Sequence, residues 1–165
     1  MVAKRRRSYE AGHTPKFLVV IDDTEECDRA FYFAVRRAAR VGAKVLMLSV
    51  LTPSDFSNWF GVGDVMREEA EAGARATLAR YVDRAGKLAG IEPEQAVREG
   101  KKAEELRMLI DEDEDIALLV LAAGSGNEGP GPLVTALAGK AIAGFPIPVA
   151  IVPGHLSDEE IDALA

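Results

Sequence analysis

Two polar segments of this chain carry residue types that could bind a phosphate together with a metal ion. Asp22 and Asp23 directly follow the apolar run of residues 17–21, and a glycine-rich stretch, residues 124–131 (GSGNEGPG), follows the apolar run of residues 116–123. Glycine has no Cβ, so such a stretch can adopt positive φ and bring its backbone close to a ligand. Its amides can then converge on an anion, helped by the N-terminus of a following helix. The two carboxylates could hold Mg²⁺ beside the phosphates.

The sequence lacks the two common nucleotide-binding signatures and any recognisable catalytic set. It has no GxGxxG after the first strand and no GxxxxGK[ST], and the pair Gly139-Lys140 falls inside a predicted helix. Its two histidines, His13 and His155, have no Cys or carboxylate cluster at metal-ligand spacing, which disfavours a zinc site. These absences favour a binding protein over an enzyme, with at most a slow hydrolytic activity that would rest on fold analogy alone.

The elements that must position these segments alternate between strand and helix. Continuous apolar runs are typical of strands buried on both faces, whereas apolar residues at helical spacing indicate helices packed on a sheet. The strands are expected at residues 17–21, 44–51, 95–98, 116–123 and 148–152, and the helices at 27–41, 62–88, 101–110 and 133–143. This alternation predicts a single-domain α/β fold, a doubly wound five-stranded parallel sheet with helices on both faces.

Helix ends are marked by possible caps. Asp23 and Glu26 have the spacing of a capping box, with Thr24 as the alternative cap, and Ser157 and Glu160 match a capping box for a short helix near the end of the chain. The single cysteine, Cys27, lies on the inner stripe of the first helix, where we expect a buried structural thiol.

Composition excludes several classes of protein. Of 165 residues, 48% are hydrophobic and 28% are charged, with no apolar run long enough to cross a bilayer. No secretory signal is visible and no intrachain disulfide is possible, so we expect a cytoplasmic protein. The net charge is −7, although residues 1–16 carry five basic side chains and one acid, so the acidic body should repel DNA and membrane surfaces. We predict a flexible basic arm over residues 1–15, a domain over 16–153 and a tail over 154–165.

A longer pattern links the glycine-rich stretch to its neighbours. Gly126, Gly129 and Gly139 give G-x2-G-x9-G directly after a buried strand. Together with an aspartate, Asp22, after the first strand and a closing apolar strand at residues 148–152, this pattern resembles the universal stress protein family over residues 16–153. The resemblance implies a sheet of order 3-2-1-4-5, homodimers that often pair their fifth strands, and, in one branch, ATP binding.

Each site residue can be carried over from that resemblance. Asp22 would meet the adenine or ribose end of the nucleotide, and Val50 would line the adenine pocket. Gly126 and Gly129 would approach the ribose and phosphates, and Gly139 would begin a second phosphate-contacting turn.

The sequence departs from the ATP-binding pattern at several positions. Lys140 stands where the pattern has Ser or Thr, and Ile142 where another hydroxyl is common. The charge of Lys140 could replace these contacts, or its long side chain could obstruct the site. Pro130 and Pro132 remove two amide donors.

The leading hypothesis is a stress-response regulatory homodimer that binds ATP or a related adenine nucleotide, with Mg²⁺ as a possible companion, and signals to a protein partner that the sequence does not identify. The alternative is a dimeric stress-response interaction module that binds no nucleotide. Three aromatic residues, Phe56, Trp59 and Phe60, could cover the edge of the core or form a lid or partner surface.

Overall fold

The apolar runs form one parallel sheet. The computed structural model describes residues 4–52 and 63–165, and within them five strands pair in the order β3-β2-β1-β4-β5. The strands are β1 (Lys16–Val20), β2 (Lys44–Leu51), β3 (Glu94–Glu99), β4 (Ile116–Ala123) and β5 (Val149–Pro153). Every neighbouring pair is parallel, which confirms the predicted fold class and strand order.

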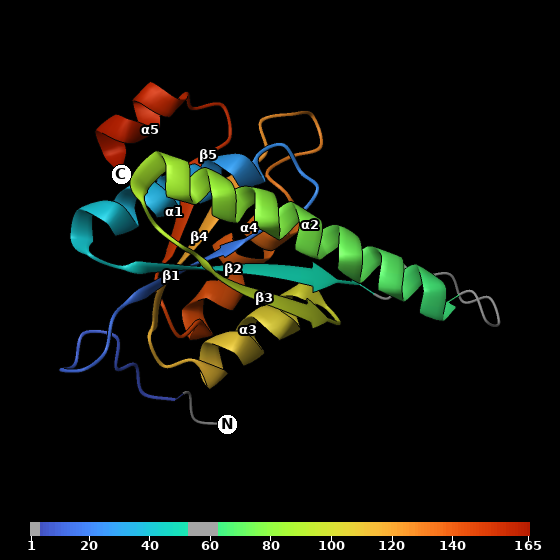
Figure 1. The fold of residues 1–165 in the computed structure, drawn as a ribbon, viewed down its shortest axis with the longest axis horizontal. Helices are drawn as coiled ribbons and strands as arrows, with labels where there is room; N and C mark the ends of the chain where they lie inside the picture. The colour runs from blue at the N-terminus through green and yellow to red at the C-terminus, as the bar shows by residue number, and fades with distance from the viewer. Residues whose placement is uncertain (1–3, 53–62) are drawn as a thin grey trace.

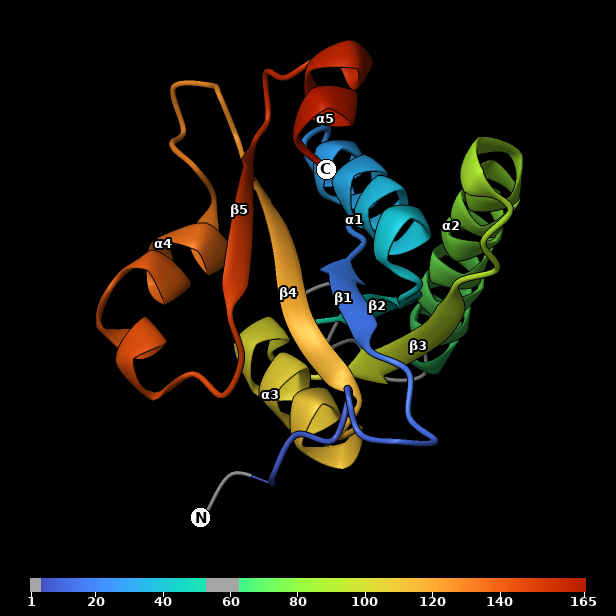
Figure 2. The same cartoon turned by 90° about the vertical axis from the view of Figure 1, so that its left-hand side faces the viewer.

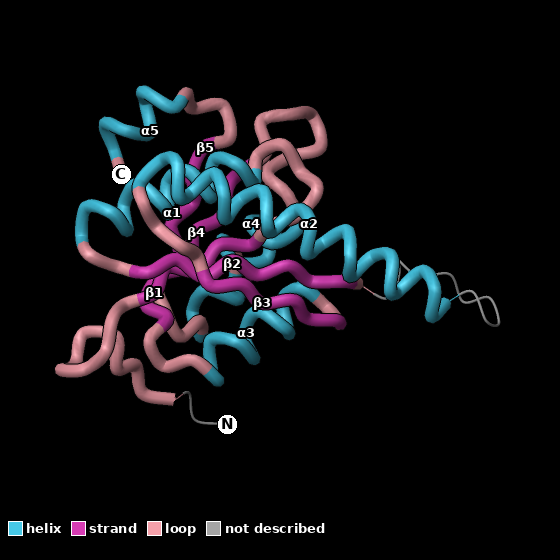
Figure 3. Tube along the Cα trace, viewed as in Figure 1, coloured by secondary structure: helices cyan, strands magenta, loops and turns pink. Residues whose placement is uncertain are grey.

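Helices cover both faces of this sheet. One face carries α1 (Cys27–Val41), α2 (Gly63–Ala89) and α5 (Asp158–Leu164), and the other carries α3 (Lys102–Glu112) and α4 (Pro132–Ala138), as Figure 2 shows. The first half of α2 extends past the carboxyl ends of β2 and β3 (Figure 1). In Figure 3 the cyan helices enclose the magenta strands, joined by pink connections at the ends of the sheet. None of the helices in the described ranges has both the length and the apolarity of a bilayer span.

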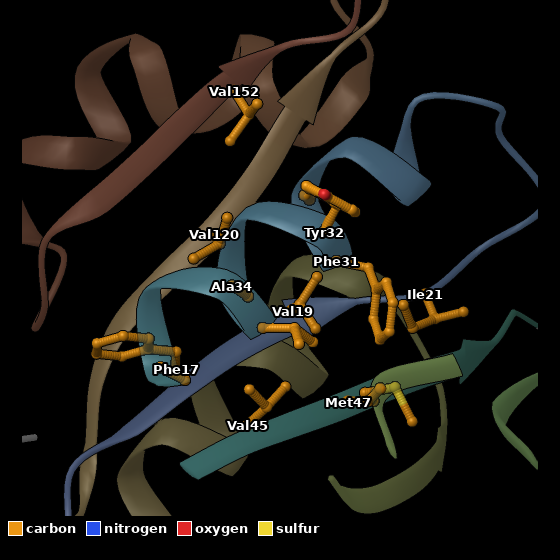
Figure 4. Packing of buried hydrophobic residues seen from close by; sticks show 14 of the residues in the cluster. Phe17, Val19, Ile21, Phe31, Tyr32, Ala34, Val45, Met47, Val120 and Val152 are labelled. Carbon is orange, nitrogen blue, oxygen red and sulfur yellow. The ribbon is translucent and has the colours of Figure 1, made fainter. Parts of the chain in front are cut away.

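Alternation along β1 divides the core between the two faces. Phe17 and Val19 pack toward α1, and Leu18 and Val20 pack toward α3 and α4. On the α1 face, Phe31 is fully buried among the residues drawn in Figure 4 and meets Tyr81 of α2 edge to face, with ring centroids 4.7 Å apart. Burying a side chain of this size stabilises the fold by about 1.5–3 kcal/mol, so the apolar stripe holds α1 on the sheet.

The helix ends agree with the sequence at some positions and differ at others. Gly42 ends α1 with a φ of 73°, and Ser157 and Glu160 form the predicted capping box at α5. The predicted capping box of Asp23 and Glu26 is wrong, because α1 begins after Glu26 and no side chain caps it. The cause is an alternative turn, in which the Asp22 carboxylate accepts the Thr24 N–H at 2.9 Å.

The helix predicted over residues 133–143 is divided in two. After α4, the backbone at Gly139 leaves the helical region, and a short 3-10 helix, η2 (Lys140–Gly144), follows. Glycine costs about 1 kcal/mol relative to alanine inside a helix, so the break falls where helix propensity is weakest. Gly139 therefore lies between two helices and Lys140 begins the second, where the sequence pattern places both within one helix.

The described part of the predicted flexible arm, residues 4–15, lies against the end of α3 and the connection to β4. Arg6 Nη1 donates to the carbonyl oxygens of Ile110 and Asp113 at 2.6 and 3.0 Å, and Ser8 is buried. His13 Nδ1 lies 2.6 Å from Asp115 Oδ1. In these contacts a basic segment satisfies the last carbonyls of a helix that ends in acidic residues, whereas the sequence predicts a flexible arm. The aromatic loop of Phe56, Trp59 and Phe60 lies outside the described residues.

Candidate ligand site at the carboxyl ends of the strands

Two adjoining hollows lie beyond the carboxyl ends of β1, β2 and β4. The first has a volume of about 560 Å³ and lies between the ends of β1 and β2 and the helix α2. The second, of about 260 Å³, lies between the end of β1, the start of α1, β4 and the start of α4. Asp22, Thr24 and Lys102 line both. In an open α/β sheet, ligands bind where the strand order reverses, and here that point is between β1 and β4.

The Asp22 carboxylate is oriented by the turn that follows β1. Its Oδ1 accepts the Thr24 N–H at 2.9 Å and the Thr24 hydroxyl at 2.5 Å. Its Oδ2 lies 3.6 Å from Lys102 Nζ. A carboxylate fixed in this way can accept a hydrogen bond from a sugar hydroxyl or an exocyclic amine.

Lys102 is a site residue that sequence reasoning missed. It is the first residue of α3, which begins shortly after β3 ends, and its side chain is partly exposed. A lysine at the start of a helix resembles an ordinary solvated cation. Its position shortly after a strand, at the ligand-binding edge of the sheet, is the sequence feature that could have identified it as a site residue.

The first hollow has one wall made by the end of β2 and another made by α2. Val50 is buried at the end of β2, as predicted, and faces the same hollow as Asp22. On the α2 side the lining residues are small, namely Ala70, Gly73, Ala74 and Thr77. Their spacing places them on one helix face, and their small side chains leave the space that a flat ring system requires. This small-residue face is a second feature that the sequence reasoning missed.

The predicted glycines take different positions. Gly126 and Gly129 belong to a loop that folds on itself, since the Gly129 N–H donates to the Gly126 carbonyl at 3.2 Å. Gly129 has a φ of 85°, which favours glycine, but neither residue lines the two hollows. Gly139 and the exposed Lys140 also lie outside both hollows. The structure thus brings Asp22 and Val50 together and leaves the other four predicted residues apart from them.

Glu26 packs directly against the glycine-rich loop. A Cβ added to Gly124 would lie 3.0 Å from Glu26 Oε1 and 3.1 Å from the Gly129 carbonyl oxygen. A Cβ added to Gly154 would lie 3.2 Å from Glu26 Cβ and 2.4 Å from the Ala123 carbonyl oxygen. Gly124 and Gly154 therefore permit the close approach of the loop, the end of β5 and the start of α1, and they place a carboxylate on the wall of the second hollow.

Cys27 also lines the second hollow, and its thiol is not activated. Its Sγ lies 3.4 Å from the Asp22 carbonyl oxygen and 3.5 Å from the Tyr81 hydroxyl. Burial raises the pKa of the Cys27 thiol above its usual value and likewise raises the pKa of Tyr81. The expected burial of Cys27 is confirmed. Because its pKa is raised, the thiol is a poor nucleophile near neutral pH.

Known proteins share the fold of this chain. The model of the universal stress protein family matches residues 14–153. The chain is similar to the universal stress protein UspA from Lactobacillus plantarum, with 20% identity, coverage of 84% of this chain and 97% of the other, and a TM-score of 0.69.

Two other similar structures are described with a nucleotide. One is a universal stress protein in complex with cAMP, at 22% identity, with 85% and 97% coverage and a TM-score of 0.57. Another is the universal stress protein from Archaeoglobus fulgidus in complex with dAMP, at 20% identity, with 84% and 97% coverage and a TM-score of 0.54. Among curated proteins, no sequence matches the chain. On the family match over most of its length, this chain belongs to the universal stress protein family.

Proposed function

We propose that this protein binds an adenine nucleotide in the two adjoining hollows, with the base in the first hollow and the sugar and phosphate directed toward the second. The observation that carries the proposal is the junction of the hollows at Asp22 and Lys102, where an acceptor for sugar hydroxyls lies beside a cation. Similar structures described as complexes with cAMP and dAMP support the choice of adenine. ATP, the ligand that the family resemblance implies, belongs to the same class.

The proposed biological role is that of a regulatory homodimer in a stress response. β5 is an edge strand, and Ile151 on it is 39% exposed. An exposed apolar edge strand is a template for pairing with another chain, so pairing of two copies through β5 would cover it. Nucleotide binding would then change what the dimer recruits.

A second candidate function is an interaction module that binds no nucleotide. It is favoured by the position of the glycine-rich loop, whose Gly126 and Gly129 line neither hollow, and by the exposed position of Lys140. The two candidates differ in whether the first hollow is ever occupied.

The deciding experiment is calorimetric titration of nucleotide-stripped protein with adenosine, AMP and ATP, each with and without Mg²⁺. Gly73→Leu supplies the site test, because a Cβ at this helical position meets nothing within 4 Å and a leucine would extend into the first hollow. We expect this variant to fold and to lose binding. Gly86→Leu is the matched control, since Gly86 is on the same helix, equally open, and outside both hollows.

Two results would contradict the proposal. Absence of binding for all three ligands would favour the interaction module. Equal affinity of the Gly73→Leu and Gly86→Leu variants would show that the nucleotide binds elsewhere.

A further inference from the structure

The second hollow presents a carboxylate where the far end of a nucleotide would lie. Glu26 lines this hollow and packs against Gly124 at the start of the glycine-rich loop. Within residues 4–52 and 63–165, the Glu26 carboxylate has neither an ion pair nor a side-chain hydrogen bond. Its charge is therefore not neutralised by a neighbouring cation, and it would act on any anion that enters the hollow.

The loop offers this hollow few hydrogen-bond donors. Pro130 and Gly131 of the loop line it together with Pro132, the first residue of α4, and the two prolines have no N–H. The Gly124 N–H is already donated to the Pro130 carbonyl at 3.1 Å. A chain of phosphates needs converging donors, and of the loop residues that line the hollow only Gly131 has an N–H.

The charges of the described lining residues also disfavour a chain of phosphates. Lys102 is the one cation among them, whereas Asp22, Asp23 and Glu26 are acidic. One lysine can pair with one phosphate group near the junction of the hollows. Further phosphates would extend past it toward Glu26 and meet repulsion.

Magnesium carried by the phosphates would relieve part of this repulsion, so the repulsion should be largest when the metal is chelated. In the described ranges, no three side chains of His, Cys, Asp or Glu converge as a metal-binding group requires. Mg²⁺ would therefore arrive with the nucleotide and be held mainly by its phosphates.

We infer that the site selects an adenine nucleotide with a single phosphate group over the triphosphate, and that Glu26 is the residue that discriminates between them. The inference rests on the proposed function and names its ligand more closely. Lys102 pairs with the one phosphate, and Glu26 repels those that follow it.

The test compares affinities for adenosine, AMP and ATP between the wild-type protein and Glu26→Gln, measured by calorimetry in EDTA and again in Mg²⁺. Glutamine keeps the size of the side chain and removes its charge. Glu128→Gln is the matched control, because Glu128 is an exposed acid of the glycine-rich loop and lines neither hollow. In the wild-type protein we expect AMP to bind at least about tenfold more tightly than ATP. Glu26→Gln should shrink that ratio several-fold, chiefly by improving ATP binding, and Glu128→Gln should leave it unchanged.

The outcomes separate this inference from the proposed function. If ATP binds wild-type protein as tightly as AMP, or if Glu26→Gln leaves the ratio unchanged, the inference is overturned while nucleotide binding stands. If neither adenosine nor AMP nor ATP binds, the proposed function itself fails. High salt provides a further check, since screening should reduce the preference for AMP in wild-type protein more than in Glu26→Gln.

Discussion

Lys102 Nζ lies 3.6 Å from Asp22 Oδ2, and this pair lies where the two hollows meet. The carboxylate comes from the turn after β1 and the ammonium from the start of α3, so two crossovers of the sheet contribute opposite charges to one point. A ligand with hydroxyl groups near a single phosphate has a partner for each.

Replacing Lys102 should affect only ligands that carry phosphate. Lys102→Met removes the cation and keeps the aliphatic length, so we expect AMP affinity to fall about tenfold and adenosine affinity to stay within about twofold. Titration calorimetry with both ligands measures the difference. Lys101→Met is the control, because the Lys101 side chain is 81% exposed and lines neither hollow. An equal loss of AMP and adenosine affinity would mean that Lys102 shapes the site rather than binds phosphate.

Replacing Ile151 should separate the proposed dimer. Ile151→Lys places a charge on the exposed edge strand, which opposes pairing with a second copy. We expect light scattering to give the dimer mass for wild-type protein at micromolar concentration and the monomer mass for the variant. Val65→Lys, at an apolar residue of α2 that is 53% exposed, should remain a dimer. A monomeric wild-type protein would refute pairing through β5.

Removing the Arg6 side chain should destabilise the fold. Arg6→Ala removes the side-chain donor of the Ile110 carbonyl oxygen and leaves the Asp113 carbonyl oxygen with the Ile116 N–H. We expect a loss of about 1 kcal/mol in the free energy of unfolding. Urea denaturation measures this loss. Arg5→Ala is the neighbouring control, because the Arg5 side chain is 87% exposed and forms a surface ion pair with Glu10, so its removal should cost little. Equal stability of both variants and the wild-type protein would show that the segment is loose, as the sequence analysis expected.

Stability should fall in alkaline solution. Burial raises the pKa of the Cys27 thiol in the folded state, whereas in the unfolded chain the thiol ionises near its ordinary pKa of 9.0. Above that pH the unfolded state binds fewer protons than the folded state, so the free energy of unfolding decreases as pH rises toward the folded pKa. The raised pKa of Tyr81 acts in the same direction from about pH 10.

Thermal melting between pH 7 and pH 11 measures this dependence. Cys27→Ala should make the decline that begins near pH 9 shallower, because the thiol no longer ionises on unfolding. An identical pH profile for this variant would remove Cys27 as a cause.

Much of the fold could be predicted because most of the strands have a recognisable sequence pattern. Each buried parallel strand is a continuous apolar run, and the residue after such a run lies at the ligand-binding edge of the sheet. Asp22 was found in this way, whereas Val50 came from the family resemblance, and both line the first hollow. The strand order came from the resemblance, since local sequence does not fix which strands are neighbours.

The remaining site residues depend on contacts between distant segments. The sequence around Glu26 fits a capping box, but a turn at Asp22 competes for the same backbone groups, and which one forms depends on how α1 packs. Lys102 looks like a solvated cation until the sheet places it beside Asp22. Arg6 resembles part of a basic tail in the sequence, and its partners are two carbonyl oxygens about a hundred residues away, one in α3 and one directly after it.

Because Cys27 lies on the wall of the second hollow, its reactivity can report whether that hollow is occupied. The chain has a single cysteine, so a thiol-alkylating reagent labels one known peptide. Its thiol lies under the Asp22 turn and is nearly inaccessible, which means that alkylation proceeds only when the start of α1 opens. A molecule seated against that wall holds it closed, and the rate of labelling then measures occupancy in a mixture, without a chromophore or an engineered probe.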